Sequence, residues 1–379
     1  MIIKDIIQYN EGRNPELLKF KYEAMKESPF RFFRGTAHLF YKDIKGNKLL
    51  DAPLSFICGD AHLENFGSFK GDNRLAYFDM NDFDEAFLGP VTIDVIRLST
   101  SIFLSKESAK FSKADSKKLV RQLIESYQAT LSKGLIRYVE RETAEGLIKE
   151  LLQIVGKRKI KVLLKIRTKG DKLRPFMKLN LIQEGKEKSR LIAGLQKVLK
   201  DYEILDAGIR YIGTGSIGID RYLLFVKGKE SDKKYLLDMK EALIPSAYKY
   251  LKIKQPVFDN TSERLIKIQS IVQSASPAYL KAIKYNDKFF VLKELQPTED
   301  RINLLAIKNF NDMEILVRNL GSILAWGSLR SSGRMGSANA DELIKYSKTL
   351  PVGDIIEYAY KYSEKIIEYY NLWKEYKPE

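Results

Sequence analysis

Two clusters of polar residues in the first quarter of the chain have the residue types that phosphoryl transfer requires. The clusters read Cys58-Gly-Asp60-Ala-His62-Leu-Glu-Asn65 and Asp79-Met-Asn-Asp82-Phe-Asp84-Glu-Ala86. Phosphoryl transfer with Mg²⁺ needs a carboxylate to hold the attacking hydroxyl, and an amide oxygen with further carboxylates to hold the metal. We predict that Asp60 is the catalytic base and that the metal ligands are Asn65, Asp82 and Asp84. The alternative is that all of these are ordinary turn residues, because Asp, Asn and Gly are common where strands end.

A third cluster, in the second half of the chain, has the composition of a loop that covers phosphate groups. It reads Gly213-Thr214-Gly215-Ser216-Ile-Gly218, lies between two strand-like runs and precedes a third run that ends at Lys240. Glycine lets backbone N–H groups approach phosphate without an intervening side chain. We predict that this loop and Lys240 bind the phosphates of a nucleotide. A plain hairpin turn and a solvated lysine are the alternatives.

Hydrophobic spacing predicts the elements that must position these clusters. Helices are expected over 14–25, around 30–40, over 94–104 and 112–155, near 186–201, from 260 to 274, and over most of 303–376 with a break near 331–337. Strands are expected at 54–58, 75–78, 209–212, 221–226, 235–239, 279–283 and 289–292, with a turn at Asn286-Asp287 between the last two. The order is helical, then a small antiparallel sheet with one helix, then helical. This order predicts an α+β protein.

The first two clusters resemble the catalytic and metal loops of the aminoglycoside phosphotransferase and choline kinase group, within the protein-kinase-like superfamily. The resemblance rests on Gly-Asp-x-His-x-x-Asn, followed by a strand and then Asp-Phe-x-x-Ala. In that group a further Asp opens the next helix, and here Asp94 follows Asp82 by 12 positions. This register implies that Asp82 rather than Asp79 holds the metal. Cys58 departs from the pattern, because the group usually has His there.

The glycine cluster and Lys240 resemble the nucleotide-covering hairpin and the third-strand lysine of protein kinases. Kinases place these before the catalytic loop, whereas here they follow it, so the kinase order is restored only when the chain is read as a circle. The resemblance therefore implies a two-lobed, circularly permuted kinase-like fold. Its parts would be a helical lobe at 1–205, a nucleotide-binding sheet lobe at 206–300 and the rest of the helical lobe at 301–379. Asp220 departs from the pattern, because kinases usually have a valine there.

A closer resemblance covers nearly the whole chain. The segments Phe30-x-x-Phe33-Arg34-Gly35, Asn81-Asp82-Phe83-Asp84-Glu85-Ala86 and Lys240-Glu241-Ala242, together with the catalytic and glycine clusters, are similar to a bacterial family called domain of unknown function 2252. That family implies no particular substrate. It therefore supports the architecture and leaves the acceptor open.

The kinase pattern also implies further site residues. The helix at 260–274 would carry the acid that pairs with Lys240, and Glu263 is its only carboxylate, although Glu263 would also suit the positive end of the helix dipole. Gln269 is the alternative partner. The hinge that binds adenine is expected at Lys293, Glu294 and Leu295. Arg34 could hold a substrate phosphate or carboxylate, and His62 could orient a phosphoryl oxygen as a further catalytic residue.

Composition and charge indicate the kind of partner. The chain has 379 residues, a formal net charge of +16, one cysteine and two histidines, which excludes a disulfide-stapled protein and most zinc sites. Ten basic residues and one acid lie between 155 and 180, and the partial alternation there predicts a strand or hairpin over the cleft. Its Lys157 to Lys178 segment would attract an anionic substrate or nucleic acid. We expect a cytoplasmic protein without a membrane span, because no apolar run is long enough to cross a bilayer.

We therefore expect an ATP- and Mg²⁺-dependent phosphotransferase that moves the γ-phosphoryl group to a hydroxyl of an unknown small-molecule or protein acceptor. Two alternatives stay open. The same metal and phosphate contacts would serve AMP transfer, and the basic surface would serve a non-catalytic module that binds nucleic acid or another anion.

Overall fold

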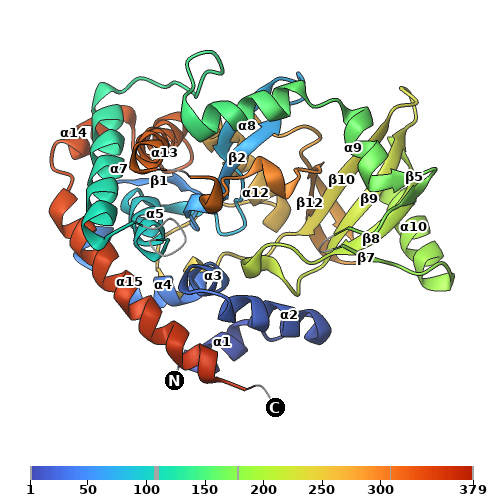
Figure 1. The fold of residues 1–379 in the computed structure, drawn as a ribbon, viewed down its shortest axis with the longest axis horizontal. Helices are drawn as coiled ribbons and strands as arrows, with labels where there is room; N and C mark the ends of the chain where they lie inside the picture. The colour runs from blue at the N-terminus through green and yellow to red at the C-terminus, as the bar shows by residue number, and fades with distance from the viewer. Residues whose placement is uncertain (1, 106–110, 177–178, 308, 378–379) are drawn as a thin grey trace.

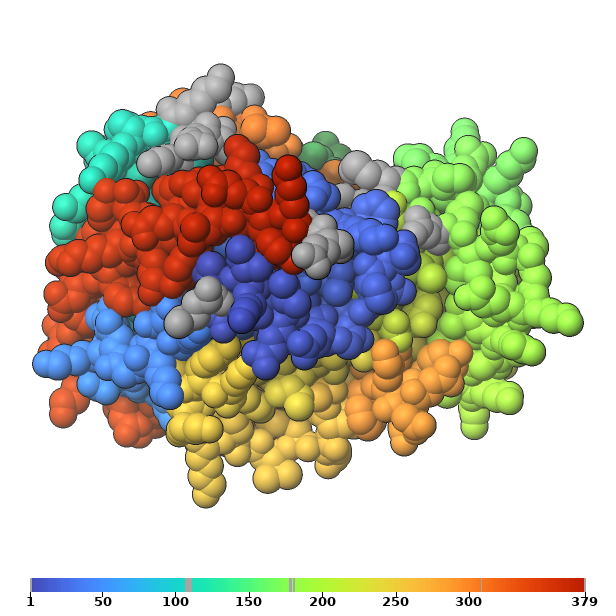
Figure 2. All heavy atoms as spheres, turned by 90° about the horizontal axis from the view of Figure 1, so that it is seen from below, coloured from blue at the N-terminus to red at the C-terminus, as the bar shows by residue number. Residues whose placement is uncertain are grey.

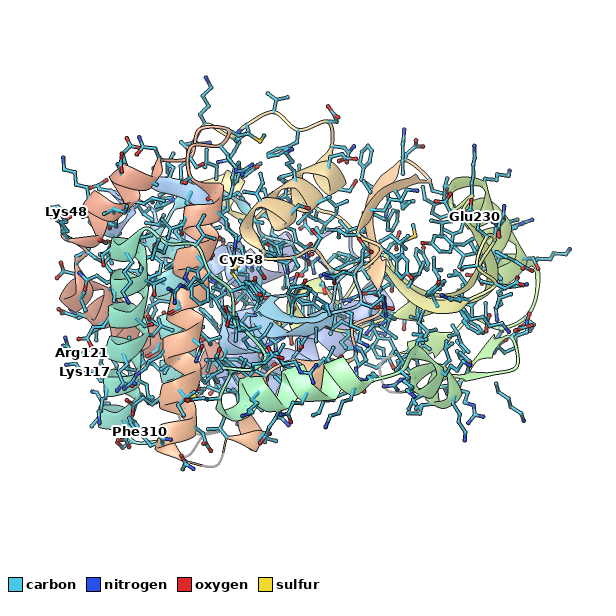
Figure 3. The ribbon with its side chains drawn as sticks, turned by 90° about the horizontal axis from the view of Figure 1, so that it is seen from above. Lys48, Cys58, Lys117, Arg121, Glu230 and Phe310 are labelled. Carbon is cyan, nitrogen blue, oxygen red and sulfur yellow. The ribbon has the colours of Figure 1, made fainter. Side chains whose placement is uncertain are left out.

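The structure is a computed structural model that describes residues 2–105, 111–176, 179–307 and 309–377. It is a mixed α+β protein, as the sequence predicts, with a large helical part and a smaller part built on an antiparallel sheet. Figure 1 shows the helical part on the left and the sheet on the right. In Figure 3, the labelled Cys58 lies within the helical part and Glu230 lies toward the far end of the sheet part.

Four short helices open the chain: α1 (Ile2–Tyr9), α2 (Pro15–Lys26), α3 (Pro29–Gly35) and α4 (Ala37–Ile44). Asn14 and Ser28 cap α2 and α3, because their side-chain oxygens accept the N–H groups of Leu17 and Arg31. The single helix predicted around 30–40 is wrong. Thr36 interrupts it, with a non-helical backbone and with its hydroxyl donating to the carbonyl of Phe32 at 2.8 Å.

Two small antiparallel pairs hold the predicted catalytic and metal loops. Strand β1 (Leu54–Ile57) pairs with β4 (Phe87–Pro90), and β2 (Phe66–Lys70) pairs with β3 (Ala76–Met80). The predicted strands at 54–58 and 75–78 are confirmed as β1 and β3. Strands β2 and β4 were not predicted, because short runs rich in Gly and Pro carry little strand signal. The 3₁₀ turns η1 (Lys48–Leu50) and η2 (Leu63–Asn65) flank the catalytic loop.

Helix α5 (Thr92–Leu104) has all of its residues buried, and α7 (Lys113–Lys133), α13 (Phe310–Ser331) and α15 (Val352–Glu375) pack against it. The helical part also contains α8 (Gly146–Lys157) and α14 (Ala340–Ser347). The helix predicted over 112–155 is two helices, because Gly134 ends α7 in the left-handed conformation with φ of 63°. The predicted break near 331–337 is confirmed between α13 and α14.

The sheet has six strands in the order β11-β12-β10-β9-β8-β7, and every neighbouring pair is antiparallel. The strands are β7 (Leu179–Leu181), β8 (Tyr202–Arg210), β9 (Arg221–Gly228), β10 (Lys234–Glu241), β11 (Lys281–Tyr285) and β12 (Lys288–Glu294). The predicted turn at Asn286-Asp287 is confirmed, and both residues have positive φ. The predicted boundary between 205 and 206 falls inside β8, so the sheet part begins earlier in the chain.

Each face of the sheet is covered. Helix α10 (Lys186–Val198) packs on one side, where Leu195 joins a cluster with Leu224 and Leu237. Helix α12 (Thr261–Val272) packs on the opposite side, where its Leu265 lies near Val291 of β12. The basic segment also covers this opposite side. It forms α9 (Ile160–Arg167) and the short strands β5 (Thr168–Lys169) and β6 (Lys172–Leu173), so the strand predicted over Lys161 to Arg167 is wrong. Lys178 lies outside the described residues.

Segments that are distant in sequence meet at two places. The N–H of Ala338, just after α13, donates to the carbonyl of Leu54 at the start of β1 at 2.8 Å. The first and last helices also lie together, because α1 and α2 pack against α15. Figure 2 shows the N-terminal residues in blue beside the C-terminal helix in red. The remaining elements are α11 (Ala247–Tyr250) and the 3₁₀ turns η3 (Thr214–Ser216), η4 (Thr298–Asp300) and η5 (Leu304–Ala306). Among the described residues, no helix is both long and apolar enough to cross a bilayer.

Candidate active site

The catalytic loop between β1 and η2 is held by Asp94 at the start of α5. The carboxylate of Asp94 accepts the backbone N–H groups of Cys58 and Gly59 at 2.9 and 3.0 Å. Gly59 has φ of 76°, and a Cβ atom there would lie 2.1 Å from the carbonyl oxygen of Glu85. The loop therefore requires glycine at this position, and its shape fixes the residue that follows, Asp60.

Asp60 forms an ion pair with Arg97, which is fully buried on α5. Burial raises the pKa of Asp60 to about 7, although Arg97 opposes the shift. The guanidinium of Arg97 also lies over the ring of Phe33, 4.4 Å from its centroid. Asp60 is thus a positioned carboxylate whose pKa lies near neutrality, a property that suits a general base.

The predicted metal residues lie together. The side-chain amide of Asn65 joins the two loops, since its Oδ1 accepts the N–H of Asp82 at 2.7 Å and its Nδ2 donates to the carbonyl of Asp82 at 3.1 Å. Lys240 reaches down from β10, with its Nζ 3.5 Å from Oδ1 of Asp82 and in an ion pair with Asp84. The structure therefore brings Asn65, Asp82, Asp84 and Lys240 into one site.

The pKa values of the two carboxyl groups beside Lys240 are shifted in opposite directions. Burial alone would raise the pKa of Asp82, but Lys240, Arg301, Lys293 and Arg221 hold it well below its ordinary value. Burial and the neighbouring charge of Asp82 raise the pKa of Asp84. Asp82 is therefore the carboxylate that four cations keep ionised.

Asp79 lies away from this site. Its buried carboxylate accepts the N–H of Ser274 at 2.9 Å and the hydroxyl of Ser274 at 3.0 Å, and it also accepts the N–H of Met80. These contacts tie β3 to the end of α12. The geometry gives Asp79 a structural role, and the assignment of the metal to Asp82 stays a prediction.

Arg34 and His62 form a second group beside Asp60. The Nε of Arg34 donates to Nε2 of His62 at 3.3 Å, and Arg34 also pairs with Glu64. Burial, together with Arg34 and Arg97, holds the pKa of His62 well below its usual range. His62 is consequently a neutral hydrogen-bond acceptor that positions the Arg34 guanidinium.

The glycine loop lies against the N-terminal helices. Its central turn is η3, and the carbonyl of Gly215 accepts Nη1 of Arg13 at 2.7 Å and Nζ of Lys21 at 3.0 Å. Arg13 also donates to the carbonyl of Ile217 at 3.1 Å. Gly213 and Gly218 have φ of 83° and 97°, which favours glycine at both ends of the loop.

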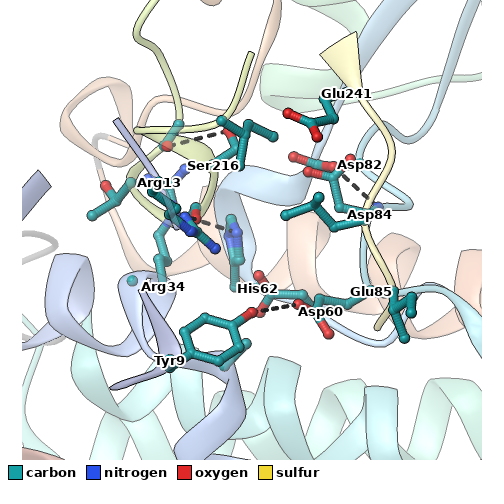
Figure 4. Close-up of a pocket in the computed structure, with 18 residues that line it drawn as sticks. Tyr9, Arg13, Arg34, Asp60, His62, Asp82, Asp84, Glu85, Ser216 and Glu241 are labelled. Atoms are coloured by element: carbon teal, nitrogen blue, oxygen red, sulfur yellow. Dashed lines mark hydrogen bonds between the residues drawn. The ribbon is translucent and has the colours of Figure 1, made fainter. Parts of the chain in front are cut away.

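One pocket, open to solvent, joins the predicted clusters. Figure 4 shows Arg13, Arg34 and Ser216 on one side, Asp82, Asp84 and Glu241 on the other, and His62 between them. Its lining comprises Asp60 and His62 of the catalytic loop, Asp82 and Asp84 of the metal loop, the residues from Gly213 to Ser216, and Arg34. A side chain that could accept a hydroxyl proton and a loop that could cover phosphates therefore face the same space.

A second pocket continues from the first beneath the sheet, and Asp82 and Asp84 line both. The charged side chains that line it are the two shared carboxylates together with Lys240, Arg221, Asp238, Lys293 and Arg301. The structure also shows the contacts of Asp220, which stands where kinases usually have a valine. Asp220 pairs with Lys288 at 2.8 Å, and its neighbour Arg221 points into this pocket, with Nε 2.9 Å from Oδ1 of Asp238.

The predicted partner acid of Lys240 is not in this pocket. Glu263 is exposed in the first turn of α12, where its N–H donates to the capping oxygen of Asn260 at 3.0 Å. Among the described residues, the lining of this pocket includes Gln269 of α12 and not Glu263. The structure thus places Glu263 outside the pocket that contains Lys240, and its assignment as a catalytic residue stays a prediction.

The predicted hinge lines a third pocket. Lys293, Glu294 and Leu295 contribute to it with Phe69, Val155, Ile160 and Leu163. The N–H groups of Glu294 and Leu295 donate to the carbonyls of Ala278 and Leu236, both at 2.8 Å, so these two donors are used within the sheet. Lys293 also lines the second pocket, and its Nζ donates to the carbonyl of Asn81 at 3.2 Å.

Several site residues escaped the sequence reasoning. Arg97 lies one helical turn after Asp94, and that spacing was a usable signal for a residue on the same face of α5. Arg301 follows the sheet by only a few residues but belongs to no motif. Arg13 and Glu85 contact partners far away in the sequence, and Glu85 accepts the N–H of Ser246 at 2.7 Å. Only the fold brings such pairs together.

Among the described residues, no group of three or more His, Cys, Asp or Glu side chains is arranged as a complete metal site. Mg²⁺ is commonly held by one or two carboxylates together with substrate phosphates. The adjacent carboxylates of Asp82 and Asp84, with the amide of Asn65 beside them, fit that type of site.

Comparison with known proteins gives one family. Searches of curated proteins and of solved structures found no match to this chain. The model of the family described as uncharacterised protein conserved in bacteria, DUF2252, matches residues 13–165 and 180–376. These ranges contain the catalytic loop, the metal loop, the glycine loop and Lys240. The chain therefore belongs to the DUF2252 family of uncharacterised bacterial proteins.

Proposed function

We propose that this protein is a circularly permuted, kinase-like phosphotransferase that uses ATP and Mg²⁺ to phosphorylate a hydroxyl group. The observation that carries the proposal is the convergence of Asp60, Asp82, Asp84 and Lys240 on adjoining pockets beside the Gly213 to Gly218 loop. These residues come from opposite halves of the chain. If these were ordinary turn residues and a solvated lysine, nothing would favour their convergence on two adjoining pockets.

The order of elements in the sheet part supports the kinase-like assignment. A glycine loop joins β8 to β9, the next strand β10 carries Lys240, and α12 lies between β10 and β11. Protein kinases likewise have a glycine-rich loop over the phosphates, a lysine on the third strand and a helix after it. Here Asp82 and Asp84, and not a helix acid, are the ion-pair partners of Lys240.

Two contacts support the permutation. The residues after α13 meet the start of β1, where the hydroxyls of Ser55 and Ser331 are 2.6 Å apart. Helix α13 would therefore lead into the catalytic loop in an unpermuted chain. The first and last helices pack together, which is the arrangement that tolerates new chain ends.

In the proposed reaction, Asp60 orients the acceptor hydroxyl and takes its proton as the hydroxyl oxygen attacks the γ-phosphorus. Arg97 holds Asp60 in place through their ion pair. Asp82 and Asp84, with Asn65, would hold Mg²⁺, which supplies neutralisation of phosphate charge when bound. Lys240 and the glycine loop would bind the phosphates, and the pocket at Glu294 and Leu295 would take the base.

The product released from ATP separates phosphoryl transfer from AMP transfer. Phosphoryl transfer leaves ADP, whereas AMP transfer leaves pyrophosphate. We expect ADP when the protein is incubated with ATP, Mg²⁺ and pools of metabolites or proteins, and the intact mass of the modified acceptor should rise by one phosphoryl group. Release of pyrophosphate without ADP would assign AMP transfer to the same site.

One observation favours a second candidate, a nucleic-acid-binding module. Lys157, Lys161 and Lys165 are exposed on α8 and α9, and the structure shows no ion pair for them with any described residue. Free lysines suit binding to phosphate backbones. Base stacking has less support, because Phe176 is partly buried beneath the guanidinium of Arg167, 4.3 Å from the ring centroid.

A further inference from the structure

The pocket beneath the sheet contains more positive than negative charge. Its lining has four cations, Arg221, Lys240, Lys293 and Arg301, against three carboxylates, Asp82, Asp84 and Asp238. Arg210 adds a further cation behind it, 2.9 Å from Asp238. Charges removed from water are unfavourable unless they are paired. The excess of cations in this pocket therefore favours the binding of an anionic ligand.

Most of these cations have a partner in the protein. Arg221 is bound to Asp238, Lys240 to the two metal-loop carboxylates, and Lys293 to the carbonyl of Asn81. Arg301 differs from them. The structure shows no hydrogen bond or ion pair for its guanidinium with any described residue, and its Nε is buried without a partner. Arg301 is therefore the cation of this pocket that has no direct partner in the protein, although its charge helps to keep Asp82 ionised.

The position of this pocket indicates which anion it takes. It shares Asp82 and Asp84 with the pocket that contains Asp60, and it shares Lys293 with the pocket at the predicted hinge. A donor that reaches from the hinge to Asp60 would therefore place its phosphate chain beside Arg301. A guanidinium suits this contact, since its N–H groups match phosphate oxygens in pairs.

We propose that Arg301, assisted by Lys293, binds the phosphate chain of the donor beneath the sheet. This inference rests on the proposed function for the orientation of the donor, but the binding itself does not require transfer. The ligand chemistry is a condensed phosphate chain, which a nucleoside triphosphate or an inorganic polyphosphate can supply. Lys240 is then one of several cations on the phosphates.

The test uses the full-length protein with Mg²⁺ and three probes: ATP, tripolyphosphate and adenosine. Calorimetry should show binding of ATP and of tripolyphosphate. Arg301→Gln should weaken both by about tenfold or more, the usual effect of losing a hydrogen bond between charged groups. Arg301→Lys should recover part of the loss, and Lys361→Gln, which removes an exposed charge on α15, should bind as wild type does. If tripolyphosphate binds as tightly as ATP, the phosphate chain alone is the ligand. If ATP binds more tightly, the adenine base also contributes to binding.

Thermal unfolding without ligand separates a binding role from a structural role. Removal of a partly buried cation that has no direct partner should leave the melting temperature of Arg301→Gln unchanged or raise it. A variant that fails to fold or melts several degrees lower would show that Arg301 stabilises the protein, and this would overturn the proposal. Unchanged tripolyphosphate binding would overturn it as well.

The outcome also separates this inference from the proposed function. If tripolyphosphate binds through Arg301 while no acceptor is ever modified, the phosphate site stands and the phosphotransferase falls. If transfer occurs and Arg301→Gln changes neither tripolyphosphate binding nor its inhibition of transfer, the phosphotransferase stands and the Arg301 site falls.

Discussion

Lys240 Nζ lies 3.5 Å from Asp82 Oδ1, although the first residue belongs to the sheet and the second to the loop after β3. This contact joins the two parts of the molecule at the site where the proposed donor would bind. Under the proposed function, Lys240 would exchange these carboxylate partners for phosphate groups. The ligand-free contact thus keeps the lysine directed into the cleft.

Replacement of Lys240 by Ala should weaken binding of ATP with Mg²⁺ by about 1.5 to 3 kcal/mol, since a lysine on phosphate is a hydrogen bond between charged groups. The nucleotide-induced rise in melting temperature measures this effect. Lys227→Ala, on the neighbouring strand and paired with the exposed Asp232, is the matched control and should respond to ATP as wild type does. Equal stabilisation of both variants by ATP would show that Lys240 does not bind the nucleotide.

Replacement of Asp82 should affect metal-dependent binding, whereas replacement of Asp79 should affect stability. Asp82→Asn should abolish the effect of Mg²⁺ on nucleotide binding, because it removes a proposed ligand. Asp79→Asn should keep that effect and should reduce the free energy of unfolding by about 1 to 3 kcal/mol, because Asp79 accepts two hydrogen bonds from Ser274 in the interior. Metal titration followed by denaturation measures both, and the reverse result would mean that the register is wrong by three residues.

Asp94→Ala should destabilise the protein by about 2 to 6 kcal/mol. The substitution leaves the N–H groups of Cys58 and Gly59 without partners, and each buried donor left unsatisfied costs about 1 to 3 kcal/mol. Urea denaturation gives the difference, with the exposed Asp341→Ala as control. A loss below 1 kcal/mol would show that Asp94 does not hold the catalytic loop.

Two glycines with similar backbone conformations separate a steric requirement from a conformational preference. Gly59 and Gly46 have φ of 76° and 78°, but an added Cβ lies 2.1 Å from the Glu85 carbonyl at Gly59 and meets no atom within 4 Å at Gly46. Gly46→Ala should cost about 1 to 2 kcal/mol, the penalty of a left-handed residue. Gly59→Ala should destabilise the protein more and should disturb Asp60. Equal losses of thermal stability in the two variants would contradict the close approach of Gly59 to the carbonyl of Glu85.

The sequence predicts well the parts of the fold that depend on local pattern. The predicted turn at Asn286-Asp287 and the helix that begins after Asn260 follow from neighbouring residues, and both occur. The clusters around Asp60 and Asp82 were also recognisable, because their spacing is fixed within one loop and one strand pair. Their meeting with Lys240 could be predicted only through the family resemblance.

Other features depend on contacts that no local pattern encodes. The alternation from Lys161 to Arg167 resembles a strand, but Leu163 and Leu164 turn one side of a helix toward the sheet. Glu263 is the only acid of its helix, yet its side chain is exposed, whereas its neighbours Ser262 and Arg264 are buried. Arg301 carries no sequence signal, because its importance comes from the charges that the fold gathers around it.

Comparison of Asp60→Asn with wild type tests the central claim most directly. The variant is nearly isosteric and removes the proposed base, whereas the predicted contacts with phosphate and metal come from other residues. ATP hydrolysis with water as the acceptor provides an assay that needs no substrate, and the nucleotide-induced thermal shift reports binding in the same samples. We predict that Asp60→Asn keeps the shift and loses about 10² to 10⁴-fold of the turnover, the usual contribution of a positioned base. Equal turnover in both proteins would contradict the assignment of Asp60, and no turnover in wild type with any acceptor pool, together with salt-sensitive nucleic-acid binding by both, would establish the binding module instead.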